Sequence, residues 1–195
     1  MTKIERSALV VHGHFSQPAR GNPITYMIGE EPEAAPFPNW NERIHENCYK
    51  PNATIGNYNY ISFSFSEGLM KWLESDAPDT YKLIVEADKQ AYEKFAPAGN
   101  AIATAYNHII MPLARKRDKR TQAIWGLAVF ERHYKRKALG FWMPEVAVDL
   151  ETLSLLAEAG VEYTVLTERQ VRNLPAGGGS GPYWVELPGG KRIGV

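Results

Sequence analysis

The feature that most restricts the fold of this chain is an alternation of short strand-like segments with longer helix-like segments. Runs rich in apolar, β-branched or aromatic residues indicate strands at 7–12, 60–65, 101–105, 138–142 and 161–166. Apolar residues at helical spacing indicate helices at about 66–73, 79–95, 118–134 and 149–158. This order predicts an α/β fold with a parallel sheet, built from about five βα units.

Two further segments complete the expected layout of one domain over residues 1–195. Residues 13–57 are rich in Pro and predict an inserted loop, longer than usual connections and therefore expected to be functional. Residues 175–182 predict a flexible loop, and residues 183–195 predict a β-hairpin that ends inside a strand. Because a complete (β/α) barrel typically needs about 250 residues, we expect a truncated barrel that lacks two or three strands.

Composition excludes several classes of protein. The chain has 22 Lys and Arg residues against 22 Asp and Glu, so it lacks the basic excess typical of nucleic-acid binding. No run approaches the roughly 18 apolar residues that span a bilayer, and no signal peptide opens the chain. The single Cys48 excludes an internal disulfide framework. We therefore expect a cytoplasmic protein without a nucleic-acid or membrane partner, whose open sheet edges favour association with another copy.

Polar residues gather at the predicted carboxyl ends of the strands. His12 and His14 end the first strand and point to one side, His108 follows the third, and Glu145 follows the fourth. Active sites of parallel α/β proteins form at this edge, where imidazoles transfer protons and carboxylates act as bases or nucleophiles. The alternatives are that the histidines are hydrogen-bonded structural residues and that Glu145 is a solvated carboxylate at a helix start.

Other conspicuous residues favour structural roles. The basic run 115–120 predicts a solvated face rather than an anion site, and Trp40, Trp72 and Trp125 predict core positions rather than sugar platforms. Asp149 predicts a helix N-cap and Gly160 the end of that helix.

Three motifs, in order over about residues 8–170, resemble those of glycoside hydrolase family 57. The first is His12-Gly-His14-Phe-Ser-Gln17-Pro18, similar to a His shortly before Gln-Pro. The second is Tyr106-Asn107-His108-Ile-Ile-Met-Pro112-Leu113. The third, Gly140-Phe-Trp142-Met-Pro144-Glu145, resembles the family's Gly-x-Trp-x-Pro-Glu.

This resemblance implies part of a (β/α)7 barrel that cleaves or transfers α-glucan chains with retention of configuration. Glu145 would be the catalytic nucleophile, while His12, His14 and His108 would line the sugar subsite and Trp142 would stack on a sugar face. The partner would be an oligosaccharide or polysaccharide, with no metal and no cofactor. The family's general acid is an Asp in a fourth motif on a later strand. That motif is absent here and Asp149 is not a substitute, so we expect an incomplete active site.

Two alternative functions remain open, besides that of a purely structural partner domain, which rests only on the open sheet edges. A metal-dependent hydrolase, similar to polysaccharide deacetylases or amidohydrolases, would use His12, His14 and His108 as ligands. Against it, no Asp directly follows any predicted strand, although those families normally need one. A non-catalytic glycan-binding relic would keep the sugar contacts and lack the general acid.

Overall fold

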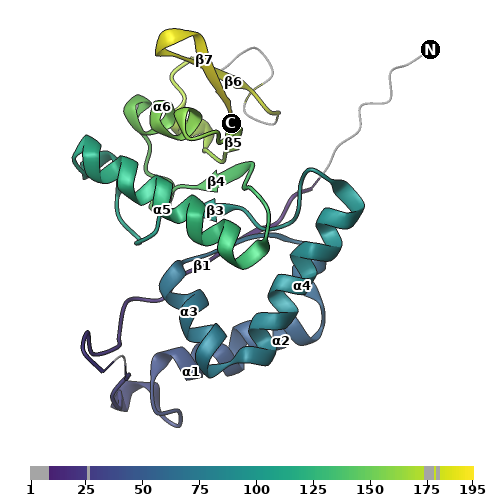
Figure 1. The fold of residues 1–195 in the computed structure, drawn as a ribbon, viewed down its shortest axis with the longest axis vertical. Coiled ribbons are helices and arrows are strands. Elements are labelled where there is room, and N and C mark those ends of the chain that lie inside the picture. The colour runs from purple at the N-terminus through teal and green to yellow at the C-terminus, as the bar shows by residue number, and fades with distance from the viewer. Residues whose placement is uncertain (1–8, 26, 174–177, 179–180) are drawn as a thin grey trace.

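The computed structural model describes residues 9–25, 27–173, 178 and 181–195, and Figure 1 shows helices packed around a succession of short strands. The strands are β1 (His12–Phe15), β2 (Ser62–Phe65), β3 (Ala103–Thr104), β4 (Gly140–Trp142), β5 (Tyr163–Thr164), β6 (Trp184–Leu187) and β7 (Lys191–Gly194). The α-helices are α1 (Trp40–Ile44), α2 (Lys50–Thr54), α3 (Glu67–Asp76), α4 (Pro78–Phe95), α5 (Lys116–Tyr134) and α6 (Leu150–Glu158).

Strands β1 to β5 follow one another in parallel across the molecule. β1 pairs with β2, and a second sheet has the order β3-β4-β5-β7-β6. A parallel bridge between Phe63 and Ala101 joins β2 to the start of β3. Helices α3 to α6 make the connections between β2, β3, β4 and β5, which are the crossovers that parallel pairing requires. The predicted α/β fold with a parallel sheet is confirmed.

The first strand begins later than predicted. β1 starts at His12, and Leu9, Val10 and Val11 are exposed by 91%, 76% and 55%. Residues 7 and 8 lie outside the described part of the chain, but for residues 9–11 the prediction of a buried strand is wrong. β1 lies at the edge of the succession, where β2 is its one partner among the described strands, so the apolar run before it is left uncovered.

The segment predicted as a loop over residues 13–57 contains helices. After the capping residue Asn39, α1 continues into a π-helix at His45–Tyr49 and then into α2. Tyr49 and, just beyond the segment, Tyr58 are 2% and 1% exposed in the core. The prediction of an uninterrupted loop is therefore wrong for residues 13–15, which belong to β1, and from Trp40 to Thr54. These helices are too short to form alone, and burial of their apolar side chains stabilises them.

Helix α5 approaches the sheet closely because it carries a glycine at the contact. A Cβ built on Gly126 would lie 2.0 Å from the carbonyl oxygen of Thr104 on β3. Around this contact the core closes with fully buried side chains from several elements, among them Phe63, Leu69, Ile84, Phe141 and Leu156. The sheet and its helices therefore share one apolar core.

Charged side chains also join elements inside the molecule. Lys119 is 2% exposed and donates to Asp149 at 2.6 Å and to Glu151 at 2.9 Å, which ties α5 to the start of α6. Within the basic run 115–120, the prediction of a solvated face is therefore wrong for Lys119. The prediction of a core position is wrong for Trp125, which is 53% exposed.

The C-terminal elements extend the sheet in a way that the hairpin pattern did not indicate. β6 and β7 form the predicted antiparallel hairpin, and β7 also pairs in parallel with β5. Asp149 caps α6 and Gly160 follows its end with a φ of +88°, as predicted. Residues 174–177, 179 and 180 of the predicted loop lie outside the described part. None of the helices in the described part is long and apolar enough to cross a membrane.

Candidate active site

Two histidines of β1 face two serines of β2. The parallel register pairs His12 with Ser62 and His14 with Ser64, so the four side chains share one face of the strand pair. His12 Nδ1 lies 3.0 Å from Ser62 Oγ, and its Nε2 lies 3.3 Å from Ser64 Oγ. His14 Nδ1 lies 2.8 Å from the same Ser64 hydroxyl. Alternation along both strands therefore brings hydroxyls and imidazoles into one row.

This row continues to the ends of β3 and β4. His14 Nε2 lies 3.2 Å from His108 Nδ1, and His108 Nε2 lies 2.8 Å from Glu145 Oε1. We call Ser62, His12, Ser64, His14, His108 and Glu145 the imidazole chain. The structure thus brings together the histidines and the carboxylate that the sequence placed at separate strand ends. The imidazole chain ends at the surface, where the His108 side chain is 31% exposed and that of Glu145 is 65% exposed.

Trp142 supports the imidazoles from one side. Its ring stacks on His12 with centroids 4.6 Å apart and lies 5.6 Å from the ring of His14, nearly parallel to both. Its Nε1 is buried and has no hydrogen-bond partner among the described residues. One face of the indole is therefore occupied by protein side chains.

Glu145 lies in a turn of unusual backbone conformation directly after β4. Glu145 and Val146 have φ values of +58° and +53°, a left-handed region that a β-branched residue such as Val rarely adopts. Each such residue costs about 1–3 kcal/mol. The buried Pro144 precedes the turn, and Gln170 donates to the carbonyl of Val146. The fold thus holds Glu145 in a strained turn next to His108.

Burial sets the charge of the two inner histidines. Burial lowers the pKa of His12 to about 4. Burial and the neighbouring His108 and His12 lower the pKa of His14 to about 4, against the opposing effect of Glu145. Both rings are therefore neutral at neutral pH, so each has one donor and one acceptor nitrogen.

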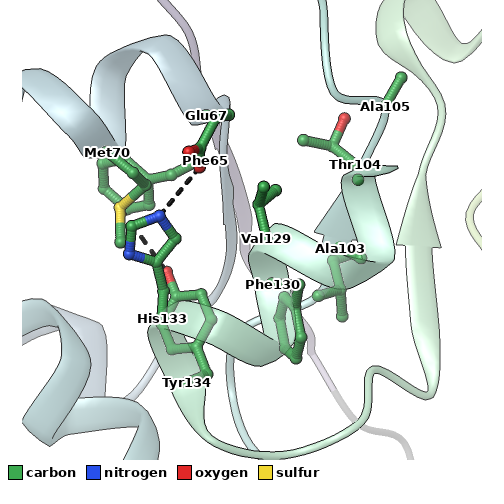
Figure 2. A pocket seen from close by; sticks show the side chains of 12 residues that line it. Phe65, Glu67, Met70, Ala103, Thr104, Ala105, Val129, Phe130, His133 and Tyr134 are labelled. Atoms are coloured by element: carbon green, nitrogen blue, oxygen red, sulfur yellow. Dashed lines mark hydrogen bonds and ion pairs between the residues drawn. The ribbon is translucent and has the colours of Figure 1, made fainter. Parts of the chain in front are cut away.

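A second polar cluster is buried among α3, α4 and α5. His133 Nε2 lies 2.9 Å from Glu67 Oε2, and the Tyr81 hydroxyl lies 2.9 Å from His133 Nδ1. Glu67 and His133 are 4% and 3% exposed. Figure 2 shows both side chains at one end of a small pocket that Thr104 and Phe130 also line.

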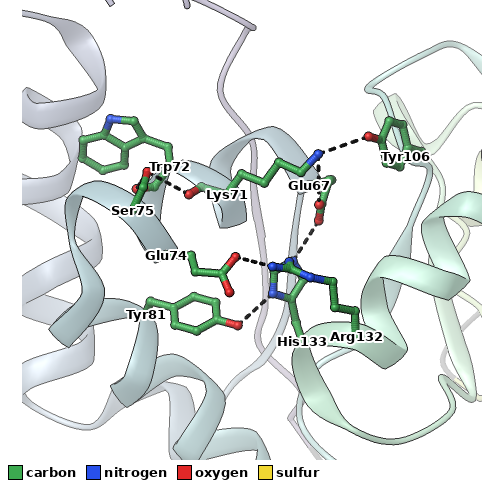
Figure 3. Close-up of polar contacts among 9 residues, drawn as sticks. All are labelled: Glu67, Lys71, Trp72, Glu74, Ser75, Tyr81, Tyr106, Arg132 and His133. Carbon is green, nitrogen blue, oxygen red and sulfur yellow. Dashed lines mark hydrogen bonds and ion pairs between the residues drawn. The ribbon is translucent and has the colours of Figure 1, made fainter. Parts of the chain in front are cut away.

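This cluster reaches the segment that carries His108. Lys71 Nζ lies 3.5 Å from Glu67 Oε1 and donates to the Tyr106 hydroxyl at 3.3 Å (Figure 3). The backbone N–H groups of Tyr106 and Asn107 donate to the backbone and side chain of Gln122 on α5. The turn before His108 is therefore held by α3 and α5 together.

The imidazoles bond to their neighbours along the row, His12 to serines and His14 to His108, instead of converging on a shared point. Within the described residues, no group of three or more His, Cys, Asp or Glu side chains is arranged to hold a metal ion. The donor set needed by the alternative reading of His12, His14 and His108 as metal ligands is therefore not assembled in this part of the chain.

A model of a known protein family matches most of this chain. The model of glycosyl hydrolase family 57 matches residues 30–189. The chain belongs to glycosyl hydrolase family 57. The match includes His108, Trp142 and Glu145, whereas His12 and His14 lie before it. No relative among curated proteins matches this chain.

Solved structures of family 57 enzymes share the fold of this chain. They include the 4-α-glucanotransferase from Thermococcus litoralis (21% identity, TM-score 0.69, 98% of this chain and 27% of that one). They also include the α-amylase AmyC from Thermotoga maritima (16% identity, TM-score 0.65, 97% of this chain and 45% of that one). A third is a branching enzyme from Thermococcus kodakaraensis, solved with glucose (14% identity, TM-score 0.61, 94% of this chain and 46% of that one). This chain spans between 27% and 46% of their lengths, so it corresponds to part of the family 57 barrel.

Neither the serines of the imidazole chain nor the buried Glu67–His133 pair was predicted from the sequence. The alternation Ser62-Phe63-Ser64-Phe65 was a usable signal, because it places both hydroxyls on one face of the strand and both Phe rings on the other. The neighbouring strand carries His-Gly-His, whose imidazoles alternate in the same way. Glu67 and His133 are 66 residues apart, and no local pattern links them.

Proposed function

We propose that this chain supplies the nucleophile, Glu145, of a retaining glycoside hydrolase or glycosyl-transferring enzyme that acts on α-glucans. The 2.8 Å bond between His108 and Glu145, at the end of the imidazole chain, carries this proposal. Family membership supports it, and the similar structures are named as a glucanotransferase, an amylase and a branching enzyme.

The bond from His108 orients the carboxylate for attack. His108 donates to Oε1, so we assign Oε2 to the attack on the anomeric carbon. The bond between that carbon and the leaving oxygen breaks, and a covalent glycosyl-enzyme forms that water or an acceptor sugar then cleaves. A hydrogen bond from this imidazole N–H stabilises the carboxylate and limits its rotation.

His12, His14 and His108 already use both ring nitrogens within the imidazole chain. A sugar hydroxyl would have to displace one of these bonds. We therefore propose that His12 and His14 act by positioning His108, while the more exposed His108 borders the sugar subsite. Trp142 then serves as a support for the imidazoles, because they occupy one of its faces.

A retaining reaction also needs a carboxylic acid about 5–5.5 Å from the nucleophile. Asp149 does not suit this role: burial raises its pKa, but bonds from Lys119 and Thr152 outweigh that effect and hold the pKa below its usual value. We propose that the chain is the N-terminal part of a catalytic barrel and that the acid belongs to another part. We also propose a cytoplasmic location.

A substrate with a good leaving group tests the nucleophile separately from the acid. α-Maltosyl fluoride needs no protonation of its leaving group, so the chain should release fluoride as the glycosyl-enzyme forms. Added azide, a nucleophile that needs no base, should then release a maltosyl azide of retained configuration. Glu145→Gln should lower the rate by about three orders of magnitude or more. The matched control is Glu131→Gln, which changes an exposed carboxylate on α5 and should leave the rate unchanged.

The outcomes separate the candidate functions. Fluoride release that survives Glu145→Gln, or a product of inverted configuration, would remove Glu145 as nucleophile. Binding of maltooligosaccharides without any fluoride release would instead support the non-catalytic glycan-binding role.

A further inference from the structure

We propose that the imidazole chain is directional, with every donor pointing toward Glu145, and that Ser64 is the positioning residue that sets the tautomer of His14. This proposal states how Glu145 is held. Its consequence for catalysis rests on the proposed function, in which Glu145 is the nucleophile. The arrangement itself follows from the hydrogen-bond contacts, with one proton on each imidazole.

The direction is set at the Glu145 end. An ionised carboxylate only accepts hydrogen bonds, so the proton in the 2.8 Å contact belongs to His108 Nε2. A His108 ring that carries one proton holds it on Nε2, so its other nitrogen, Nδ1, accepts. The 3.2 Å contact with His14 therefore requires His14 Nε2 to donate.

The serines carry the same direction back to the start of β1. His14 Nδ1 must accept, and its partner at 2.8 Å is the Ser64 hydroxyl, which spends its one proton there. Ser64 Oγ can then only accept from His12 Nε2 at 3.3 Å. His12 Nδ1 is left to accept from the Ser62 hydroxyl at 3.0 Å. All three imidazoles are therefore in the Nε2–H form.

Ser64 is the point at which the two β1 histidines are linked. Within the imidazole chain, Ser64 alone bonds to both His12 and His14. Its side chain is 0% exposed, so water does not compete for the hydroxyl proton. The lowered pKa values of His12 and His14 agree with two neutral rings. A tautomer change at His14 would reverse the contact with His108 and remove the donor that orients Glu145.

The test reads the tautomers directly by long-range ¹H–¹⁵N NMR of the ¹⁵N-labelled full chain at neutral pH, without substrate. In the wild type, His12, His14 and His108 should each show a protonated Nε2 and a bare Nδ1. Ser64→Ala removes the donor to His14 Nδ1, so the ¹⁵N signals of His14 should shift toward a mixture of both tautomers, and those of His108 should move with them. Ser62→Ala should alter the signals of His12 and leave those of His108 close to the wild type.

The matched control is Ser66→Ala, which removes another buried hydroxyl of the same segment, one without a hydrogen-bond partner among the described residues. It should leave all three imidazoles unchanged. A wild-type His14 protonated at Nδ1, or a Ser64→Ala variant with wild-type imidazole signals, would overturn the proposal. Thermal unfolding of each variant checks that it is folded. Because no substrate is present, failure here is distinct from failure of the fluoride assay, which tests Glu145 as nucleophile.

Discussion

Glu67 and His133, both almost fully buried, bring their side chains to 2.9 Å from each other between α3 and α5. Removing one member of a buried pair takes from the other its partner in that pair, which costs about 3–5 kcal/mol. Glu67→Leu and His133→Leu should each lower the free energy of unfolding by about this amount. The double variant should lose less than the sum, because two apolar side chains leave no orphaned charge. Urea unfolding of the four proteins measures the cycle, and strictly additive losses would contradict the pairing.

Acidification should destabilise the protein over the interval in which His12 and His14 titrate in the unfolded chain. Burial lowers the pKa of both imidazoles from 6.5 to about 4. Between these values the unfolded chain binds protons that the folded chain does not, and stability rises with pH wherever that holds. The free energy of unfolding should therefore fall as pH is lowered from about 6.5 to about 4, as urea unfolding at several pH values would show.

The matched variant for this pH dependence is His14→Gln, which removes one titrating ring and should flatten the slope relative to the wild type. His45, whose pKa burial also lowers, contributes in the same direction and remains in both proteins. The pKa of Asp149 is held below its usual value of 3.8. Its contribution to the free energy of unfolding is therefore lost only as the pH falls through and below that value. A slope unchanged by His14→Gln would show that the ring titrates alike in both states.

The contact between α5 and β3 should not tolerate a methyl group. Gly126→Ala places a Cβ 2.0 Å from the Thr104 carbonyl oxygen, so the helix or the strand must move. We expect a loss of about 1–3 kcal/mol in the free energy of unfolding. Gly68→Ala is the control, because a Cβ at this exposed position of α3 meets nothing within 4 Å. Since Ala is favoured over Gly inside a helix, this variant should raise the free energy of unfolding by about 0.5–1 kcal/mol. Equal effects at both sites would argue against the close approach.

Lys119 should matter far more than its neighbours in the same basic run. Lys119→Met removes the donor shared by Asp149 and Glu151 and leaves their like charges close together. The expected loss is about 1.5–3 kcal/mol, the range for hydrogen bonds to charged groups. Lys116→Met, at an exposed position of the same helix, should change stability by less than about 0.5 kcal/mol. Similar thermal unfolding midpoints for the two variants would contradict the buried role of Lys119.

The sequence predicted the parallel order because each central strand and helix carries its own local pattern. It did not predict the late start of β1, because the apolar run before His12 reads the same whether or not another element covers it. The short helices from Trp40 to Thr54 escaped prediction because packing, rather than periodicity, stabilises them. Lys119 shares a run of exposed basic residues, and only the fold shows which of them faces two carboxylates.

The same distinction applies to the candidate site. His12, His14, His108 and Glu145 were selected because strand ends of a parallel sheet meet at one edge, a rule that needs no knowledge of packing. The bonds among them depend on the register between β1 and β2 and on the turn at Glu145, neither of which is written in a local motif. Ser64 has no chemical signature of its own and gains its role from its position opposite His14.

The pairing of β1 with β2 has a consequence for how this protein tolerates insertions and deletions. Neighbouring residues of a strand point to opposite faces, so sliding β1 by a single step would turn both imidazoles away from the hydroxyls. Sliding it by two steps toward the C-terminus of β2 would restore the facing and set His12 opposite Ser64. Length changes ahead of this strand that move it by an odd number of residues should thus disconnect His108 and Glu145 from the hydrogen bonds of β1 and β2, whereas even ones preserve the parity on which the row depends.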